Sequence, residues 1–164
     1  ACGRRNRGRV RETMRLLEEA RERGVDMTAD QYPYAAGSTT LRSILPPWIH
    51  AGGVEKLIER LSGPALRERL KREIPEAEGW ENMLRNSGGP EGVMMLYCPK
   101  TPDFEGKRLT EIGAMTGKDP LDAAFDIIIE NRGSDTACFF QLARLQQKLL
   151  QRFLVRLRLH LKLL

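Results

Sequence analysis

The 164-residue sequence lacks any apolar run of the roughly 18–20 residues that a helix needs to cross a bilayer. Apolar residues make up 41% of the chain and charged residues 30%, which is the composition of a globular domain with its own core. The basic opening ACGRRNRGR is not followed by a continuous apolar stretch, as it would be in a secretory signal. We therefore expect a soluble protein that works in the cytoplasm.

Cysteine and histidine are scarce, and this limits the chemistry available to the chain. The three cysteines, Cys2, Cys98 and Cys138, are odd in number and far apart, so they predict neither a disulfide framework nor a paired metal knuckle. The two histidines are His50 and His160. Because catalytic zinc needs three protein ligands and an open position, we predict no metal-ligating residue in this chain. Cys98 and Cys138 lie in apolar stretches and are expected in the core.

Motifs for nucleophilic catalysis and for phosphate binding are also missing. Ser38 lies in AGSTT, which is not the G-x-S-x-G turn of a catalytic serine, and no histidine partner is indicated. The glycines of NSGGPEG at residues 86–92 lack the Lys-Ser/Thr ending of a phosphate-binding loop. We predict no catalytic residue within the chain.

Acidic residues are absent from residues 143–164, which hold nine leucines and six basic residues. Without these six, 21 basic residues stand against 22 acidic ones, so the net charge of +5 comes from this segment. Leu150, Leu154, Leu157 and Leu161 share a helical face, which permits a basic amphipathic helix for a membrane, a partner groove or nucleic acid. A plain C-terminal helix, or a non-native segment translated out of frame, are the other interpretations. We therefore divide the chain into residues 1–142 and a leucine-rich tail, 143–164.

Hydrophobic periodicity within residues 1–142 predicts alternating helices and strands, the order typical of an α/β protein with parallel strands. The predicted helices cover about residues 9–23, 54–62, 64–74 and the segment between an Asp119 cap and Gly133. The predicted strands are residues 25–29, GVMMLYC at 92–98 and TACFFQL at 136–142. Residues 79–89 are expected to form a turn-rich link.

The loop at residues 28–41, TADQYPYAAGSTTL, carries an unusual concentration of neutral hydroxyl groups at the end of a predicted strand. In α/β barrels this end of the strands is where ligands bind, and neutral donors suit a carboxylate or amide oxygen. The alternative is a strand-to-loop turn in which the tyrosine rings are buried and the hydroxyls cap the backbone. Periodicity alone does not separate the two interpretations.

Two stretches of the sequence carry a family resemblance. GRRNRGRVRETMRLLEEARERGVDMTADQYPYAAGSTTL and FEGKRLTEIGAMTGKDPLDAAFDIIIE resemble the N-acyl-D-amino-acid deacylases (D-aminoacylases) of the amidohydrolase superfamily. The most specific pattern is D-x-Y-P-Y-x-A-G-S-T, from Asp30 to Thr39, and the G-K and G-K-D-P-x-D pattern from Gly106 to Asp122 follows in the right order. The resemblance covers roughly residues 1–142 and does not extend into the tail.

The resemblance implies a zinc-dependent hydrolase with a (β/α) barrel that cleaves N-acyl-D-amino acids to a carboxylic acid and a D-amino acid. It implies that Tyr32 and Ser38 contact the substrate carboxylate, while Asp30 and Tyr34 are treated as scaffold. The family's zinc ligands and catalytic aspartate belong to segments that do not match this chain. We therefore expect a fragment, a partial barrel with a helical insertion, that is inactive when isolated.

Two other functions remain open from the sequence. One is a different amidohydrolase of the dihydroorotase type, since the segments that would distinguish it are the metal-ligand segments. The other is a non-enzymatic module whose basic tail binds a membrane or nucleic acid. The favoured interpretation expects a small-molecule substrate and neither nucleic acid nor membrane as a partner.

Overall fold

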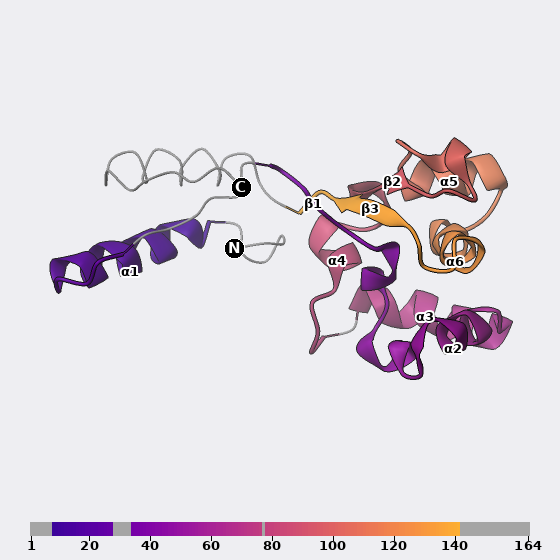
Figure 1. The fold of residues 1–164 in the computed structure, drawn as a ribbon, viewed down its shortest axis with the longest axis horizontal. Helices are drawn as coiled ribbons and strands as arrows, with labels where there is room; N and C mark the ends of the chain where they lie inside the picture. Colours follow the sequence, from indigo (N-terminus) through magenta and orange to yellow (C-terminus); the bar gives the residue numbers. More distant parts are fainter. Residues whose placement is uncertain (1–7, 28–33, 77, 142–164) are drawn as a thin grey trace. The chain divides into compact units, whose positions relative to one another are not determined.

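The structure is a computed structural model that describes residues 8–27, 34–76 and 78–141 (Figure 1). The chain divides into two compact units, and each is described by itself. One comprises Ala1–Ala35 and Gln141–Leu164, and the other comprises Ala36–Phe140. The leucine-rich tail predicted for residues 143–164 lies outside the described residues. None of the described helices is both long and apolar enough to cross a membrane.

The first unit contains one described helix, α1 (Val10–Glu22), which confirms the helix predicted over residues 9–23. An ion pair from Arg9 to Glu12 (3.2 Å) supports its first turn, and Gly24, at φ +81°, ends it in the left-handed conformation. The strand predicted for residues 25–29 is wrong over 25–27, which have no regular structure, and 28–29 lie outside the described residues. A strand needs a neighbour to satisfy its backbone groups, and no described residue pairs with 25–27.

The second unit is built on a three-stranded sheet in the order β1-β3-β2. The strands are β1 (Gly37–Thr39), β2 (Val93–Tyr97) and β3 (Thr136–Phe139). The second and third confirm the strands predicted at 92–98 and 136–142. Both neighbours of β3 run antiparallel to it, so the prediction of parallel strands is wrong for this sheet.

The connection between β2 and β3 differs from the single-helix crossover of a typical parallel pair. Parallel neighbours need a single crossover, usually one helix, between them. Here two helices, α5 (Leu109–Thr116) and α6 (Pro120–Glu130), lie between β2 and β3. Before α5, the chain also turns back along β2, where Met95 and Lys107 share a backbone hydrogen bond of 2.9 Å. The described strands form one three-stranded sheet, and the predicted partial barrel stays a prediction.

Helical residues fill most of the remainder. The predicted helices are confirmed as α2 (Gly53–Leu61), α3 (Pro64–Glu76) and α6, whose Asp119 cap accepts a hydrogen bond from the Leu121 amide at 2.8 Å. The turn-rich link predicted at 79–89 is wrong where α4 (Met83–Ser87) forms, because the Asn82 side chain caps it at Arg85 N (3.0 Å). Short 3₁₀ helices are η2 (Leu41–Ile44), η3 (Pro47–His50), η4 (Pro90–Gly92) and η5 (Pro102–Phe104).

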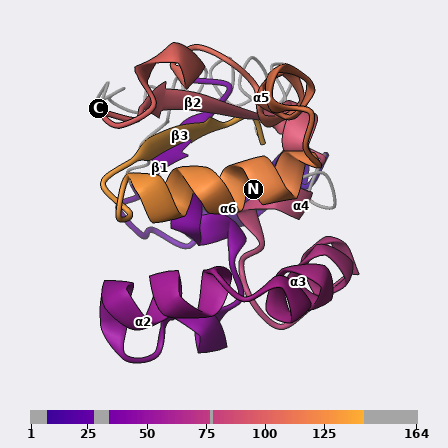
Figure 2. The ribbon, with the colours of Figure 1, turned by 90° about the vertical axis from the view of Figure 1, so that its right-hand side faces the viewer.

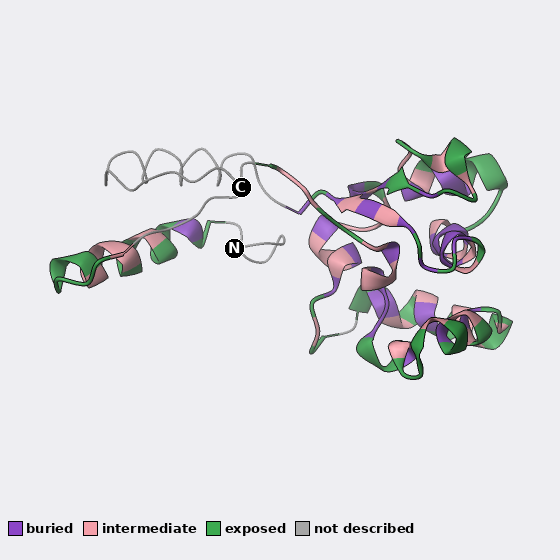
Figure 3. Cartoon of the chain, viewed as in Figure 1, coloured by how far each residue is buried: buried purple, intermediate pink, exposed green. Residues whose placement is uncertain are grey.

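Helix α6 is the centre of the second unit. It lies between the sheet and the α2–α3 pair (Figure 2), and its apolar residues Leu121, Phe125 and Ile128 are buried, while Ile129 is half-buried. Because it is covered from several sides, it also buries Ala124 and Ile127. Figure 3 shows the buried residues gathered between these layers and the exposed ones on their outer faces.

An ion-pair network fastens α3 to α6. Arg67 of α3 donates to Asp126 at 2.8 Å, and Lys71 of α3 donates to Asp122 at 2.7 Å. Lys118, just before α6, donates to the other oxygen of Asp126 at 2.6 Å. The two aspartates and Arg67 are each about one-fifth exposed, so these pairs are less screened by water than the pairs on the surface.

Replacing Asp126 with asparagine should reduce the acid sensitivity of the fold. Burial alone would raise the pKa of the Asp126 carboxyl, but hydrogen bonds from Lys118 and Arg67 outweigh it and hold the pKa below its usual value. Such a carboxyl stabilises the fold above about pH 4, and that stability is lost as the pH falls through its folded pKa. Urea unfolding across this range should therefore show a shallower loss of stability at low pH in Asp126→Asn.

Asp103→Asn is the matched control for this experiment, since Asp103 is an exposed aspartate of η5. The free energy of unfolding of Asp103→Asn should fall at low pH as steeply as that of the native chain. The prediction is wrong if Asp126→Asn and the native chain lose stability in parallel as the pH falls.

Candidate functional site

Ser38, one of the two residues predicted to contact substrate, is exposed and lies in the middle of β1 at the edge of the sheet. Side chains of a strand point alternately to its two faces, and residues opposite one another on neighbouring strands share a face. The register pairs Gly37 with Phe139, Ser38 with Cys138 and Thr39 with Ala137. Ser38 and Cys138 are therefore on one face, and Thr39 is on the other.

The face of Ser38 is the outer face of the sheet. Cys138 pairs on its other side with Met94 of β2, so Ser38, Cys138 and Met94 form one row across the three strands. We call these three residues the Ser38 row. The opposite face holds Phe139, Ala137, Val93 and Met95, all of them fully buried, and Thr39, which is exposed on the edge strand. The Ser38 row is exposed at Ser38 and half-buried at Cys138 and Met94.

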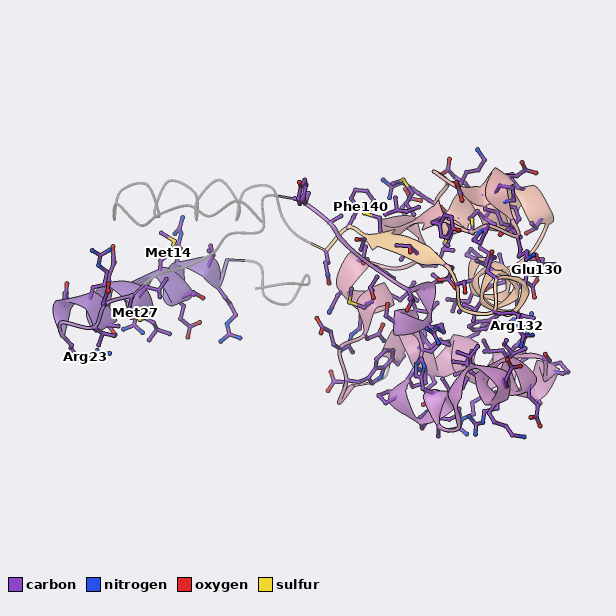
Figure 4. All side chains as sticks on the ribbon, viewed as in Figure 1. Met14, Arg23, Met27, Glu130, Arg132 and Phe140 are labelled. Atoms are coloured by element: carbon purple, nitrogen blue, oxygen red, sulfur yellow. The ribbon has the colours of Figure 1, made fainter. Side chains whose placement is uncertain are left out.

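A guanidinium group borders the Ser38 row on the β2 side. Arg108 forms an isolated antiparallel bridge with Met94, and its guanidinium carbon lies 4.8 Å from the centre of the Phe140 ring. Phe140 directly follows β3 (Figure 4) and is 37% exposed. It is two residues after Cys138, and the alternation of side chains along a strand predicts that the two share a face. Arg108 also forms an ion pair with Glu91, whose carboxylate Oε1 lies 3.6 Å from Arg108 Nε. The negative charge of Glu91 partly offsets the positive charge of Arg108.

The chemistry of this face favours binding over nucleophilic attack. Burial raises the pKa of the Cys138 thiol, and the nearby Arg108 charge opposes this only in part. A thiol with a raised pKa remains protonated near neutral pH, and the thiolate is the nucleophilic form. The Ser38 hydroxyl and the Cys138 thiol are thus neutral groups, and a hydroxyl can donate to a carboxylate oxygen.

The tyrosines of the predicted loop are only partly described. Tyr32 and Asp30 lie outside the described residues. Tyr34 is 58% exposed, so the alternative in which the tyrosine rings are buried in a turn is wrong for Tyr34. The predicted contact of Tyr32 and Ser38 with a substrate carboxylate stays a prediction.

The histidine and the two cysteines among the described residues are not part of a metal-binding cluster. His50 is in η3, Cys138 is in the sheet and Cys98 is fully buried after β2, where its thiol contacts the Thr101 carbonyl at 3.1 Å. Residues 8–27, 34–76 and 78–141 contain no group of three or more His, Cys, Asp or Glu placed to hold a metal ion. These residues therefore do not fit a catalytic zinc site by themselves.

Asp135 is a buried carboxylate that the sequence did not single out. It is 3% exposed, precedes β3, and its Oδ1 accepts a hydrogen bond from the Leu41 amide at 2.6 Å. Its partner is 94 residues away in the sequence, so no local pattern could have indicated the contact. The polar stretch GSD before TACFF indicates only a turn.

The fold of the chain is similar to a segment of solved deacylase structures. One similar structure is a D-aminoacylase with a binuclear metal centre, at a TM-score of 0.51 and 23% identity. Another is the N-acyl-D-glutamate deacylase of Bordetella bronchiseptica, complexed with zinc and a phosphonate inhibitor that mimics the tetrahedral intermediate, at a TM-score of 0.50 and 21% identity. Each match covers 93% of this chain and 22% of the other.

No family model and no curated protein sequence matches the chain. The structural likeness confirms the predicted resemblance to D-aminoacylases at the level of the fold. The chain spans about one-fifth of the length of those structures, 22% in both cases.

Proposed function

We propose that the chain is a segment of a cytoplasmic N-acyl-D-amino-acid deacylase of the amidohydrolase superfamily, and that the loop holding Tyr32 and Ser38 grips the substrate carboxylate. The observation that carries the proposal is the position of Ser38, whose hydroxyl is exposed on the outer face of an edge strand. The likeness of the fold to two D-amino-acid deacylase structures supports it, as does the D-x-Y-P-Y-x-A-G-S-T motif.

In the whole enzyme, a metal ion would activate the water that attacks the amide. The part of this chain would be to bind and orient the substrate. A hydroxyl donor binds a carboxylate without adding a positive charge that would compete with a metal for its ligands. The described residues hold neither a set of metal ligands nor a base beside one, so we expect no amide hydrolysis by this chain alone, with or without added zinc. The partial barrel is part of the same proposal.

Replacing Ser38 with alanine should weaken the binding of an N-acetyl-D-amino acid about tenfold. A hydrogen bond to a charged group contributes roughly 1.5–3 kcal/mol, and 1.4 kcal/mol corresponds to a factor of ten. Isothermal titration calorimetry with N-acetyl-D-methionine and its L enantiomer measures this directly. The D enantiomer should bind the native chain more tightly than the L enantiomer does.

Thr39→Val is the matched control, because Thr39 is the next residue of β1 and lies on the opposite face. It should bind the D enantiomer as the native chain does. The proposal fails if the native chain does not bind this ligand, or if Ser38→Ala binds it with unchanged affinity. Release of acetate by the isolated chain would contradict the expected lack of hydrolysis.

A further inference from the structure

The strand that carries Ser38 is held at its end by a side chain instead of a backbone ladder. In the register of β1 and β3, Thr39 pairs with Ala137, so Leu41 would stand opposite Asp135 if the ladder continued. The chain leaves the sheet at Thr40 to enter η2, and the Leu41 amide donates to Asp135 Oδ1 at 2.6 Å instead. The Thr40 side chain does not cap this helix. Asp135 therefore replaces both the next ladder bond and the missing cap.

The acceptor of the Leu41 hydrogen bond is a carboxylate that is buried away from water. Asp135 is 3% exposed, and its second oxygen, Oδ2, is buried without a hydrogen-bond partner among the described residues. Burial raises the pKa of this carboxyl, while the Leu41 amide and the Arg42 charge oppose the rise. Burying a carboxylate costs free energy, and the Leu41 amide and the Arg42 charge offset that cost only in part.

The surroundings keep the carboxylate and its amide partner in place. Arg42 of η2 packs so closely on Gly133 that a Cβ there would lie 2.9 Å from Arg42 Nε. Arg42 is the charged side chain that acts on Asp135. The pKa of the Cys98 thiol, after β2, is raised mainly by burial and in small part by the Asp135 charge. The segment before β3 and the segment after β1 are thus packed together on both sides of the hydrogen bond.

We propose that Asp135 is a positioning residue for Ser38, because its hydrogen bond to the Leu41 amide holds the end of β1 in register. A strand of three residues has few ladder bonds of its own, and a shift of one residue would move Ser38 to the other face. The consequence for ligand binding rests on the proposed function, whereas the ordering of β1 by Asp135 does not.

NMR-detected hydrogen exchange and calorimetry on the whole chain test the proposal with two variants. Asp135→Ala removes the acceptor, and the exchange of the Ser38–Leu41 amides should become about tenfold faster, with binding of N-acetyl-D-methionine weakened by a similar factor. Asp135→Asn keeps an oxygen acceptor of the same size but a weaker, neutral one, so exchange at Leu41 should be severalfold faster than in the native chain and binding weakened less than in Asp135→Ala. A residue that only adds stability would change exchange throughout the unit and would not affect β1 in particular.

Asp119→Ala is the matched control, since Asp119 caps α6 by the same kind of bond to the Leu121 amide (2.8 Å). It should speed exchange at the start of α6 and leave β1 and the ligand affinity unchanged. If Asp135→Ala does not fold, Asp135→Asn decides alone: its weaker, neutral acceptor should speed exchange at Leu41 severalfold, with that at Leu121 unchanged.

The results separate this proposal from the proposed function. The positioning role is overturned if Asp135→Ala exchanges its Ser38–Leu41 amides at the native rate. If the alanine variant does not fold, the role is overturned if Asp135→Asn exchanges its Leu41 amide at the native rate. Both outcomes hold independently of ligand binding. Faster exchange there, in a chain whose native form does not bind N-acetyl-D-methionine, supports the positioning role and overturns the proposed function. Faster exchange with native affinity shows that the order of β1 does not govern binding, and overturns the link to Ser38.

Discussion

Replacing Phe125 with alanine should lower the free energy of unfolding by about 3–5 kcal/mol. Phe125 is fully buried in α6, the helix between the sheet and the α2–α3 pair. Truncation removes buried apolar surface and leaves a cavity that the neighbouring side chains fill only in part. It also removes the ring above which the Arg67 guanidinium carbon lies, 5.8 Å from the ring centre. Urea unfolding followed by circular dichroism measures the loss.

Phe140→Ala is the matched control for the same residue type outside the core. Phe140 is 37% exposed and its ring contacts the Arg108 guanidinium. Its removal should cost about 1 kcal/mol or less, since little surface is newly exposed and a partly exposed cation–π contact contributes about 0.5–1 kcal/mol. Equal losses in the two variants would show that α6 is not the centre of the core.

Replacing Gly92 with alanine should destabilise the second unit by about 3 kcal/mol or more, at or above the upper end of the usual cost of overpacking. A Cβ at this position would lie 2.0 Å from the Ser87 carbonyl oxygen and 2.7 Å from its carbonyl carbon. These are backbone atoms, so no side-chain rotation relieves the overlap. Gly92 must move, and its carbonyl is the acceptor for the Phe140 amide at 2.9 Å, so the displacement reaches the sheet.

Gly63→Ala tests whether the loss at Gly92 comes from the overlap and not from the change of residue. A Cβ at Gly63 would meet only the Arg60 carbonyl oxygen, at 3.4 Å, and the φ angle there is not in the left-handed region. This variant should stay within about 1 kcal/mol of the native chain and is expected to be slightly stabilising, because alanine restricts the unfolded chain. A Gly92→Ala variant as stable as Gly63→Ala would contradict the close approach.

The helices followed from local patterns. The Asp119 cap, Pro120 at the first position and the apolar stripe of α6 all lie within about three turns of chain, so the sequence alone specifies where this helix begins and which side it buries. α1, α2 and α3 were predicted for the same reason. α5 was not predicted, because Gly113 interrupts its apolar pattern. The structure explains this glycine, since a Cβ there would lie 2.9 Å from the Lys118 carbonyl oxygen.

One feature of the candidate site is visible in the sequence, and another depends on the tertiary structure. The motif around Ser38 predicts a polar ligand loop from the sequence, because its hydroxyl groups are neighbours in the chain. That Ser38 shares a face with Cys138 depends on which strand lies beside β1 and in which direction it runs. Neither is visible locally, since the pairing joins residues about 100 positions apart.

The sequence by itself therefore determined α1, α2, α3 and α6 and two of the three strands, since each depends on residues within a few turns of one another. It did not show that residues 37–39 of the predicted hydroxyl-rich loop form β1. Only the tertiary structure decided the antiparallel order β1-β3-β2 and the contact of Asp135 with Leu41. Strand pairing and a long-range hydrogen bond are set by which surfaces the helices leave to be buried, and this depends on the packing of the whole unit around α6.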